Sequence, residues 1–569
     1  MLTNCCHCII ITYTSTDEKQ NYAKRSLHHK VDKQKTSENN PLHEACRKGY
    51  LGRVRRILSR RLVDVNGRDE KHGRTPLMVA AHKGHRRVFD FLIRNGADVS
   101  QVDDDGNNIL HWACRGGHMD MVRYVLKQYS VDINSRAKKG RTPLMMAASD
   151  GHRDVFEFLV SKGANVSQVD DGGNNILHWA CRGGHVGMVK YVLTQYSVDI
   201  NSRAKKGRTP LMMAAYYGHR NVFEFLVSKG ANVSQVDDYG DNILHLACRG
   251  GHLGMARYLL SEYTLDINSR GKYGSTPLMK AASDGHRDVF QFLVSKGANV
   301  SQVDDYGDNI LHWACRGGHL GMAKYLLSEY SVDINSRGIY GSTPLMKAAS
   351  HGHRDVFEFL VSKGVNVSQV DDYGDNTLHW ACRGGHLGMA RYLLSKYSLD
   401  INSRGKYGST PLMKAASDGH REMFWFLESF GANVSQVDDD GDNILHYASS
   451  GGHPEMVKYI LSQDFVDINR RGNYGGTPLM RAAYNGNIQV FDLLVSKGGQ
   501  TPLTDDNGDN ILHLATLRGR VEMVKHILSQ NMTDINARDK DGDTAAMIAK
   551  REGQHGVFNF LVSRGCPVE

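Results

Sequence analysis

Apolar residues recur in two short blocks within every segment of about 33 residues, and polar residues separate the blocks. In the segment that begins at Gly274, the inward-facing positions are Leu278, Ala281 and Ala282 in the first block and Val289, Phe290, Phe292 and Leu293 in the second. Their spacing is typical of one face of a helix. The pattern therefore predicts two short helices per segment. Gly285 ends the first, and Gly297 ends the second in the left-handed conformation that glycine tolerates.

Polar residues at the segment boundaries mark where each helix pair begins and how it connects to the next. Thr276 is a suitable N-cap, and Pro277 fits the first turn, where a missing N–H costs nothing. After the second helix, residues 298–309 (ANVSQVDDYGDN) are polar and rich in turn formers. This stretch predicts a hairpin-like connection, here called a finger, that leads to the following segment.

The segments alternate between two types and repeat every 67 residues. Those of one type contain Thr-Pro-Leu (TP repeats), and those of the other contain Leu-His (LH repeats), so that a double unit has 33 plus 34 residues. Residues 240–306 and 307–373 differ at only 8 of 67 positions. Two such short helices cannot bury a core alone, but stacked copies can. The sequence predicts an all-α repeat solenoid.

The consensus TPLM-x-AA-x-x-GH-x-x-VF-x-FLVS-x-GA resembles the ankyrin repeat, over about residues 40–569 and in about 16 copies. The resemblance implies helix-turn-helix pairs joined by β-hairpin-like fingers, in a curved solenoid that holds other proteins and performs no catalysis. Residues 40–72 and 542–569 depart from the consensus, as expected of capping repeats. Residues 1–39 are polar and lack periodicity, which predicts a disordered basic tail.

Composition favours a chain that remains inside the cell. No apolar run of about 18 residues is present, so no transmembrane helix is predicted. The N-terminus lacks the basic region and the long apolar stretch of a secretory signal. We therefore expect the cytoplasm, with the nucleus as an alternative, where thiols stay reduced. The net charge of +9 is concentrated in residues 1–94, which hold 20 Lys/Arg and 9 Asp/Glu.

The motif LHWACRGGH at 110–118 raises the question of a metal site or a nucleophile, because it places Cys114 between His111 and His118. Later copies replace the cysteine by Ser449 and Thr516 while the repeat continues. A zinc ligand would not tolerate this change, whereas a small core residue would. We interpret the motif as structural. No catalytic or phosphate-binding motif occurs, so neither enzymatic activity, a cofactor, a metal nor a small-molecule substrate is predicted.

Tyrosines occupy the finger tips in a long series of repeats and are the first candidates for partner binding. Tyrosine offers a large contact area at low entropic cost, which suits an interface. Alternatively, the fingers stack Tyr on Tyr and pair their charges, or duplication simply copied a harmless residue. The six consecutive positions are Tyr239, Tyr273, Tyr306, Tyr340, Tyr373 and Tyr407.

A second row of candidates lies on the first helix of each repeat, where cations and aromatic residues alternate. In ankyrin-like stacks this position lies toward the concave side. The row either satisfies itself through cation–π contacts, with lysine stems covering apolar surface, or forms a groove for an extended acidic or aromatic peptide. Its candidate residues, here called the ladder, are Lys280, Trp313, Lys347, Trp380 and Lys414.

A third candidate is the basic N-terminal end, where arginines surround one short helix. The patch is either a solvated end cap or a surface for nucleic acid or an anionic membrane. It comprises Arg53, Arg55, Arg56, Arg60 and Arg61. Taken together, the sequence predicts a non-enzymatic scaffold or adaptor that binds partner proteins on its concave and finger surfaces. The alternative is a tether that acts through residues 1–94.

Overall fold

The computed structural model describes residues 41–60, 63–463 and 466–568. The predicted tail at 1–39 lies outside these residues. The described chain contains 32 α-helices, arranged as 16 successive pairs, as the repeat count predicts. It divides into two compact units, which meet in sequence between Val300 and Ser301. Each unit is described by itself.

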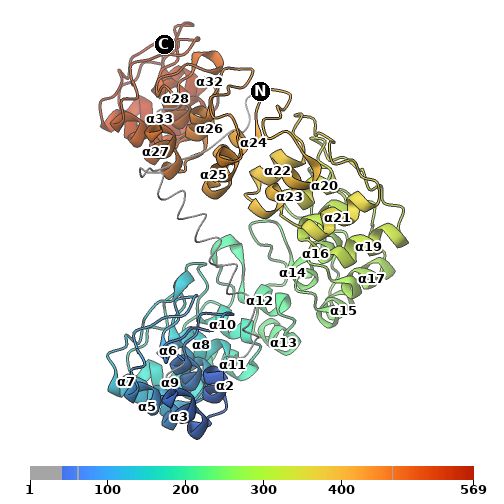
Figure 1. The fold of residues 1–569 in the computed structure, drawn as a ribbon, viewed down its shortest axis with the longest axis vertical. Coiled ribbons are helices and arrows are strands. Elements are labelled where there is room, and N and C mark those ends of the chain that lie inside the picture. Colours follow the sequence, from blue (N-terminus) through green and yellow to red (C-terminus); the bar gives the residue numbers. More distant parts are fainter. Residues whose placement is uncertain (1–40, 61–62, 464–465, 569) are drawn as a thin grey trace. The chain divides into compact units, whose positions relative to one another are not determined.

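The first unit contains eight helix pairs and two short 3₁₀ turns (Figure 1). Its elements are α2 (Pro41–Arg47), α3 (Leu51–Ser59), α4 (Pro76–His82), α5 (Arg86–Arg94), α6 (Ile109–Gly116), α7 (Met119–Gln128), η1 (Lys138–Gly140), α8 (Pro143–Ser149), α9 (Arg153–Ser161), α10 (Ile176–Gly183), α11 (Val186–Gln195), η2 (Lys205–Gly207), α12 (Pro210–Tyr216), α13 (Arg220–Ser228), α14 (Ile243–Arg249), α15 (Leu253–Glu262), α16 (Pro277–Ser283) and α17 (Arg287–Ser295).

The second unit contains the other eight pairs and one 3₁₀ turn. Its elements are α18 (Ile310–Gly317), α19 (Leu320–Glu329), α20 (Pro344–Ser350), α21 (Arg354–Ser362), α22 (Thr377–Arg383), α23 (Leu387–Tyr397), α24 (Pro411–Ser417), α25 (Arg421–Ser429), α26 (Ile444–Gly451), α27 (Pro454–Ser462), η3 (Asn473–Gly475), α28 (Pro478–Asn485), α29 (Ile488–Ser496), α30 (Ile511–Leu517), α31 (Val521–Ser529), α32 (Ala545–Arg551) and α33 (His555–Ser563).

The helix starts follow from two different caps. In the TP repeats, the hydroxyl of Thr276 and its counterparts accepts a hydrogen bond from the backbone N–H three residues on, and proline fills the first turn. In the LH repeats, an asparagine replaces threonine: the side chain of Asn309 accepts from the N–H groups of Leu311 and His312. The LH repeats therefore have a side-chain cap of their own, although they lack Thr-Pro.

The core is a column of small first helices backed by larger second helices. Within each unit the first helices of successive repeats pack closely together, whereas the second helices contact one another less. The predicted faces of α16 and α17 are buried, including Phe290 and Leu293 at 0% exposure. A phenylalanine at the same place in the other TP repeats is also fully buried: Phe89, Phe156, Phe223, Phe357, Phe424 and Phe491. Repetition of one packing unit thus builds the core.

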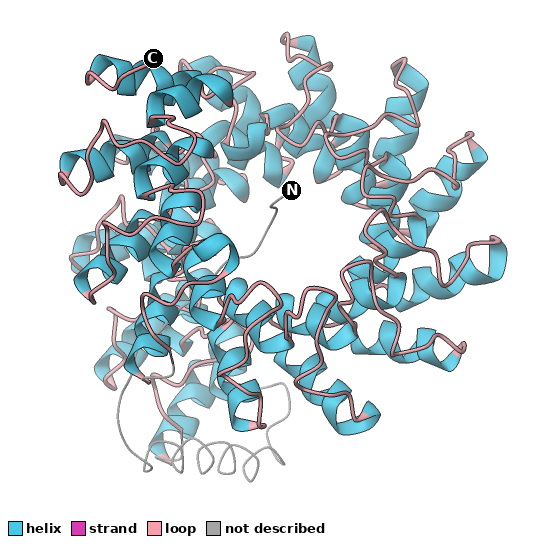
Figure 2. Ribbon diagram, turned by 90° about the horizontal axis from the view of Figure 1, so that it is seen from above, coloured by secondary structure: helices cyan, strands magenta, loops and turns pink. Residues whose placement is uncertain are grey.

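The fingers are tight turns, and the described residues form no strand beyond isolated bridges (Figure 2). In the finger at 237–241, the N–H of Asp237 donates to the carbonyl of Asp241 over 3.0 Å, and Gly240 turns the chain at φ 69°. Neighbouring fingers are tied by charge, as in the 2.8 Å ion pair of Arg337 with Asp372. The predicted pairing of charges between fingers is therefore present.

The described part of the solenoid ends in one helix pair on each side, and all its helices are short. The expected capping repeats correspond to α2–α3 and α32–α33, and their capping role stays a prediction. The longest helix among the described residues, α23, has 11 residues, and none has the length and apolarity needed to cross a bilayer.

Candidate interaction surfaces

The finger tyrosines are exposed in both units. The six side chains named above are between 38% and 53% exposed. In the second unit, the ring centroids of Tyr340 and Tyr373 are 5.9 Å apart, and those of Tyr373 and Tyr407 are 6.4 Å apart. Three rings therefore make one continuous aromatic surface over three successive fingers.

Backbone contacts fix the spacing of this row without using its side chains. The N–H of Tyr373 donates to Oδ1 of Asp371 over 2.9 Å, which holds the turn. The carbonyl of Tyr373 then accepts from the N–H of Lys406 in the next finger over 2.6 Å. The backbone thus holds Tyr373 in register with the next finger, and the exposed part of its ring contributes nothing to the core.

The ladder cations are buried and paired with carboxylates. Nζ of Lys347 lies 2.7 Å from Oδ2 of Asp308, in the preceding finger, and 5.4 Å from the ring centroid of Trp380. Lys414 makes the same 2.7 Å pair with Asp375. The predicted approach of a lysine to a neighbouring ring is confirmed for Lys347 and Trp380. The carboxylate, which is the closer partner, escaped the sequence analysis.

A covariation inside the sequence could have revealed these carboxylates. Where the finger ends in Asn (Asn107 and Asn174), the ladder position of the next repeat is Met146 or Met213. Where it ends in Asp, that position is a cation in four successive repeats; the pairs are Asp241 and Lys280, Asp308 and Lys347, Asp375 and Lys414, and Asp442 and Arg481. The charge of the two positions changes together because they touch.

The ladder aromatics are satisfied by a second carboxylate. Nε1 of Trp313 donates to Oδ2 of Asp304 over 3.1 Å, and Nε1 of Trp380 donates to Asp371 over 3.0 Å. Burial raises the pKa of Asp371, and the neighbouring Asp375 raises it further. The geometry favours the self-satisfied ladder, and a direct role of its residues in partner binding stays a prediction.

The Cys and His side chains of the LHWACRGGH motif make structural contacts. Cys114 is fully buried, and this burial raises the pKa of its thiol far above the ordinary range. His111 places Nδ1 2.8 Å from the side-chain oxygen of Asn108 and Nε2 3.1 Å from the carbonyl of Arg141 in the next repeat. Burial lowers the pKa of His111 to about 4, so the imidazole is neutral. Among the described residues, no group of three or more His, Cys, Asp or Glu is placed to hold a metal.

The basic end exposes its arginines on α3. Arg53, Arg55 and Arg56 are exposed along the helix, and Arg60 is exposed just beyond it. Arg61 lies outside the described residues. The packed neighbour α5 adds further exposed arginines, so the positive surface covers two second helices; these are Arg86, Arg87 and Arg94.

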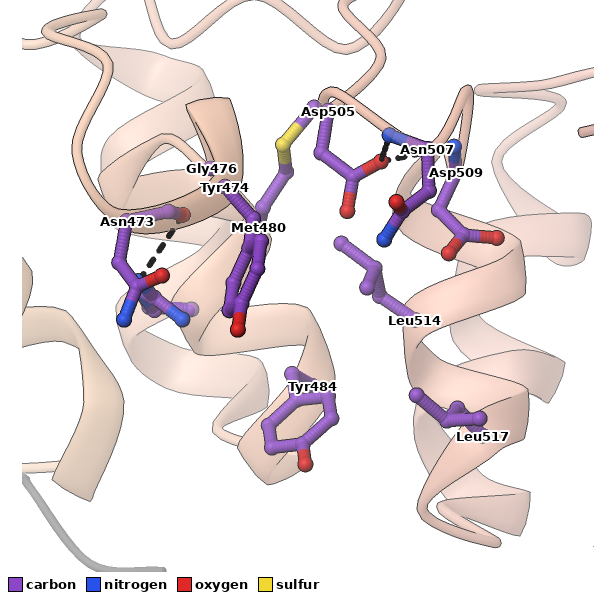
Figure 3. A pocket seen from close by; sticks show the side chains of 11 residues that line it. Asn473, Tyr474, Gly476, Met480, Tyr484, Asp505, Asn507, Asp509, Leu514 and Leu517 are labelled. Atoms are coloured by element: carbon purple, nitrogen blue, oxygen red, sulfur yellow. Dashed lines mark hydrogen bonds between the residues drawn. The ribbon is translucent and has the colours of Figure 1, made fainter. Parts of the chain in front are cut away.

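A small pocket lies between α28 and α30, on repeats that follow those of the ladder (Figure 3). It has a volume of about 80 Å³. Figure 3 shows Leu514 and Leu517 facing Tyr484 across it, with Asp505 and Asp509 on the finger side. The sequence analysis missed this pocket, although Leu514 visibly replaces the tryptophan of LHWACRGGH. We call these five residues the socket.

The fold and these surfaces define a helical repeat scaffold, and comparison with known proteins gives its family. Matches to the family model described as "Ankyrin repeats (3 copies)" extend, with overlaps, from residue 15 to residue 569. The chain belongs to the ankyrin repeat family. Ankyrin repeats are in general interaction modules without catalysis.

Known relatives share the repeats but are much longer. The chain is similar to human "Transient receptor potential cation channel subfamily A member 1" (25% identity; 78% of this chain and 44% of the relative). It is also similar to two Caenorhabditis elegans proteins: "Ankyrin repeat and KH domain-containing protein mask-1" (31%; 50% and 12%) and "Poly [ADP-ribose] polymerase tankyrase" (25%; 68% and 18%). The chain spans less than half the length of each.

Proposed function

We propose that this chain is a protein-interaction scaffold or adaptor that binds partner proteins through its finger tips and the adjoining face of its first helices. The observation that carries this proposal is the continuous surface of Tyr340, Tyr373 and Tyr407, whose exposed rings have no role in the core. Exposed tyrosines that the backbone holds in register provide contact area at low entropic cost. The ladder supports the central finger of this surface, because Lys414 pairs with Asp375, two residues after Tyr373.

Partner capture from source-cell lysate tests the proposal. The full chain is compared with a triple variant, Tyr340→Ser, Tyr373→Ser and Tyr407→Ser. The matched control replaces three exposed lysines at the ends of second helices by serine: Lys229, Lys363 and Lys497. We expect the tyrosine variant to lose partners that the wild type and the lysine control retain. Identical partner sets for all three proteins would contradict the proposal.

The basic end supports a second candidate function, a tether to nucleic acid or an anionic membrane. Its support is the group of exposed arginines on α3 and α5. Binding of this kind falls steeply between about 50 and 200 mM salt, whereas an aromatic interface weakens less. Substitution of Arg53, Arg55 and Arg56 by serine should weaken such binding and reduce its salt dependence. Tight binding that resists salt and survives these substitutions would exclude the tether.

We further propose that the chain works in the cytoplasm or the nucleus. The support is chemical: among the described residues, seven cysteines are buried as free thiols. Buried free thiols fit a reducing compartment.

A further inference from the structure

The positions that form the socket carry other side chains in the corresponding repeats. In the second unit, Trp313 and Trp380 each donate to the first finger aspartate, and Lys347 and Lys414 each pair with the second. An arginine also lies over each of these indoles; Arg383, for example, is 5.8 Å from the ring centroid of Trp380. One ladder step thus holds three side chains that the repeats themselves supply.

The step around Asp505 and Asp509 lacks all three. Leu514 stands at the tryptophan position, Leu517 at the arginine position and Ile548 at the lysine position. None of these side chains can donate a hydrogen bond. The two carboxylates therefore keep their places in the finger while the donors that meet them elsewhere are gone.

Asp509 carries the clearest consequence. Its Oδ1 is buried and has no hydrogen-bond partner within the described part of the chain. The nearest basic nitrogen is Nδ1 of His513 at 3.7 Å, and burial lowers the pKa of this histidine, which keeps it neutral. Burial, Asp505 and Asp539 raise the pKa of Asp509 to about 6. A buried carboxylate without a counter-ion is costly, so a cation is the group this site lacks.

Three arginines approach the socket, and each is engaged elsewhere. Arg518 lies over the ring of Tyr484, 4.8 Å from its centroid. Arg481 lines the pocket, but its guanidinium is engaged with Asp442 at 2.9 Å. Arg551 lowers the pKa of Asp509, but Asp539 and Asp541 raise it, and Arg551 pairs with Asp543 and Glu552. The side chains of Leu514, Leu517 and Tyr484 complete a site that is acidic at one end and apolar along its walls.

We propose that the socket binds one basic side chain, lysine or arginine, from a partner protein. Its aliphatic stem lies against Leu514 and Leu517, and its charged head meets Asp505 and Asp509. At about 80 Å³ the pocket suits a single side chain rather than a drug-sized molecule, which needs roughly 300–1,000 Å³. The inference deepens the proposed function, since it assigns one contact of the scaffold to a stated chemistry.

The experiment uses isolated side chains, so its outcome is independent of capture through the finger tyrosines. Saturation-transfer NMR measures binding of the N-acetyl methylamides of arginine, lysine, norleucine and tryptophan to the full chain. We expect the arginine and lysine probes to bind about tenfold more tightly than the uncharged norleucine probe. Preference for the tryptophan probe would overturn the basic occupant, and absence of binding by every probe would overturn the socket.

Three variants locate the binding. Asp509→Asn removes the unpaired charge and places there the asparagine that the array carries at Asn107 and Asn174, a residue that the repeat accepts at this position. Leu514→Trp combined with Tyr484→Ser restores the tryptophan and serine that stand at these two positions in other repeats, as in Trp380 and Ser350. Both are expected to weaken the basic probes about tenfold. Asp541→Asn removes an exposed charge outside the lining and is the control, with unchanged binding. Equal weakening by Asp509→Asn and Asp541→Asn would reduce the effect to general electrostatics and overturn the proposal.

Discussion

The ammonium of Lys347 lies 2.7 Å from Oδ2 of Asp308, and both side chains are at least 86% buried, with 14% and 5% of their areas exposed. Each side chain therefore supplies the counter-ion of the other inside the stack. The same two positions carry asparagine and methionine in earlier repeats, as Asn174 and Met213. The array thus contains a charged and an uncharged version of one contact.

This pair gives a stability prediction with an internal control. Lys347→Met leaves Asp308 buried without a counter-ion and should cost about 3 kcal/mol, the range for breaking a buried pair from one side. Adding Asp308→Asn reproduces the natural Asn–Met version and should recover most of the loss. Hydrogen exchange of α18 and α20 measures both effects locally, since a repeat array need not unfold as a whole. Equal protection in the single and double variants would contradict the pairing.

A second prediction concerns the tryptophan of the LH motif, such as Trp380, and the residue before the turn of the preceding TP repeat, such as Ser350. The two leucine copies of the LH motif, Leu246 and Leu514, follow repeats that carry Tyr216 and Tyr484 where others carry serine or histidine. Trp380→Leu should therefore lose about 2–3 kcal/mol of local stability through a cavity and a lost hydrogen bond to Asp371.

Addition of Ser350→Tyr should recover part of that loss, because it reproduces the Tyr–Leu combination of the two natural leucine copies and the new ring covers part of the space that the indole leaves. Hydrogen exchange of α20 and α22 provides the measurement. The control is Ser350→Tyr alone, which should destabilise because it crowds the indole. A double variant less stable than Trp380→Leu would show that the tyrosine does not compensate.

A third prediction is a loss of stability in acid. Burial lowers the pKa of His379 and His446 to about 4. It also lowers the pKa of the equivalent histidines His178, His245 and His312 in other LH repeats. The unfolded chain binds protons below about pH 6.5, whereas the folded chain does not until lower pH. The stability that these neutral imidazoles contribute is present above pH 6.5 and is lost as the pH falls toward 4.

Buried carboxylates oppose this slope. The pKa of Asp438 and that of Asp509 are raised to about 6, so these two groups favour the folded state as the pH falls from about 6 to 4. Burial raises the pKa of five further aspartates, which act in the same sense: Asp150, Asp237, Asp304, Asp371 and Asp418. Because the buried histidines outnumber them, the urea midpoint should fall between pH 7.5 and 5. Asp438→Asn should steepen the fall. NMR titration should show that the His379 imidazole stays neutral above pH 5; its protonation near pH 6.5 would refute the assignment.

A fourth prediction is that the finger tyrosines contribute little to stability. Replacement of Tyr340, Tyr373 and Tyr407 by serine should change stability by no more than about 0.5 kcal/mol per site, as expected for exposed positions. Thermal unfolding of the full chain measures this. A loss several times larger would mean that the rings support the finger stack, and the row would then be structural.

The sequence by itself determined the repeat architecture, since periodicity, caps and turn glycines are local signals that recur in every copy. It also assigned Cys114 and His111 to structure, because later copies dispense with the cysteine while the repeat persists. Only the tertiary structure decided how neighbouring repeats meet. The partner of Lys347 is Asp308, 39 residues away in sequence, and the socket is lined by Leu514, Leu517 and Tyr484 together with Asp505 and Asp509. Such contacts depend on distances between repeats, which the pattern within a single repeat does not encode.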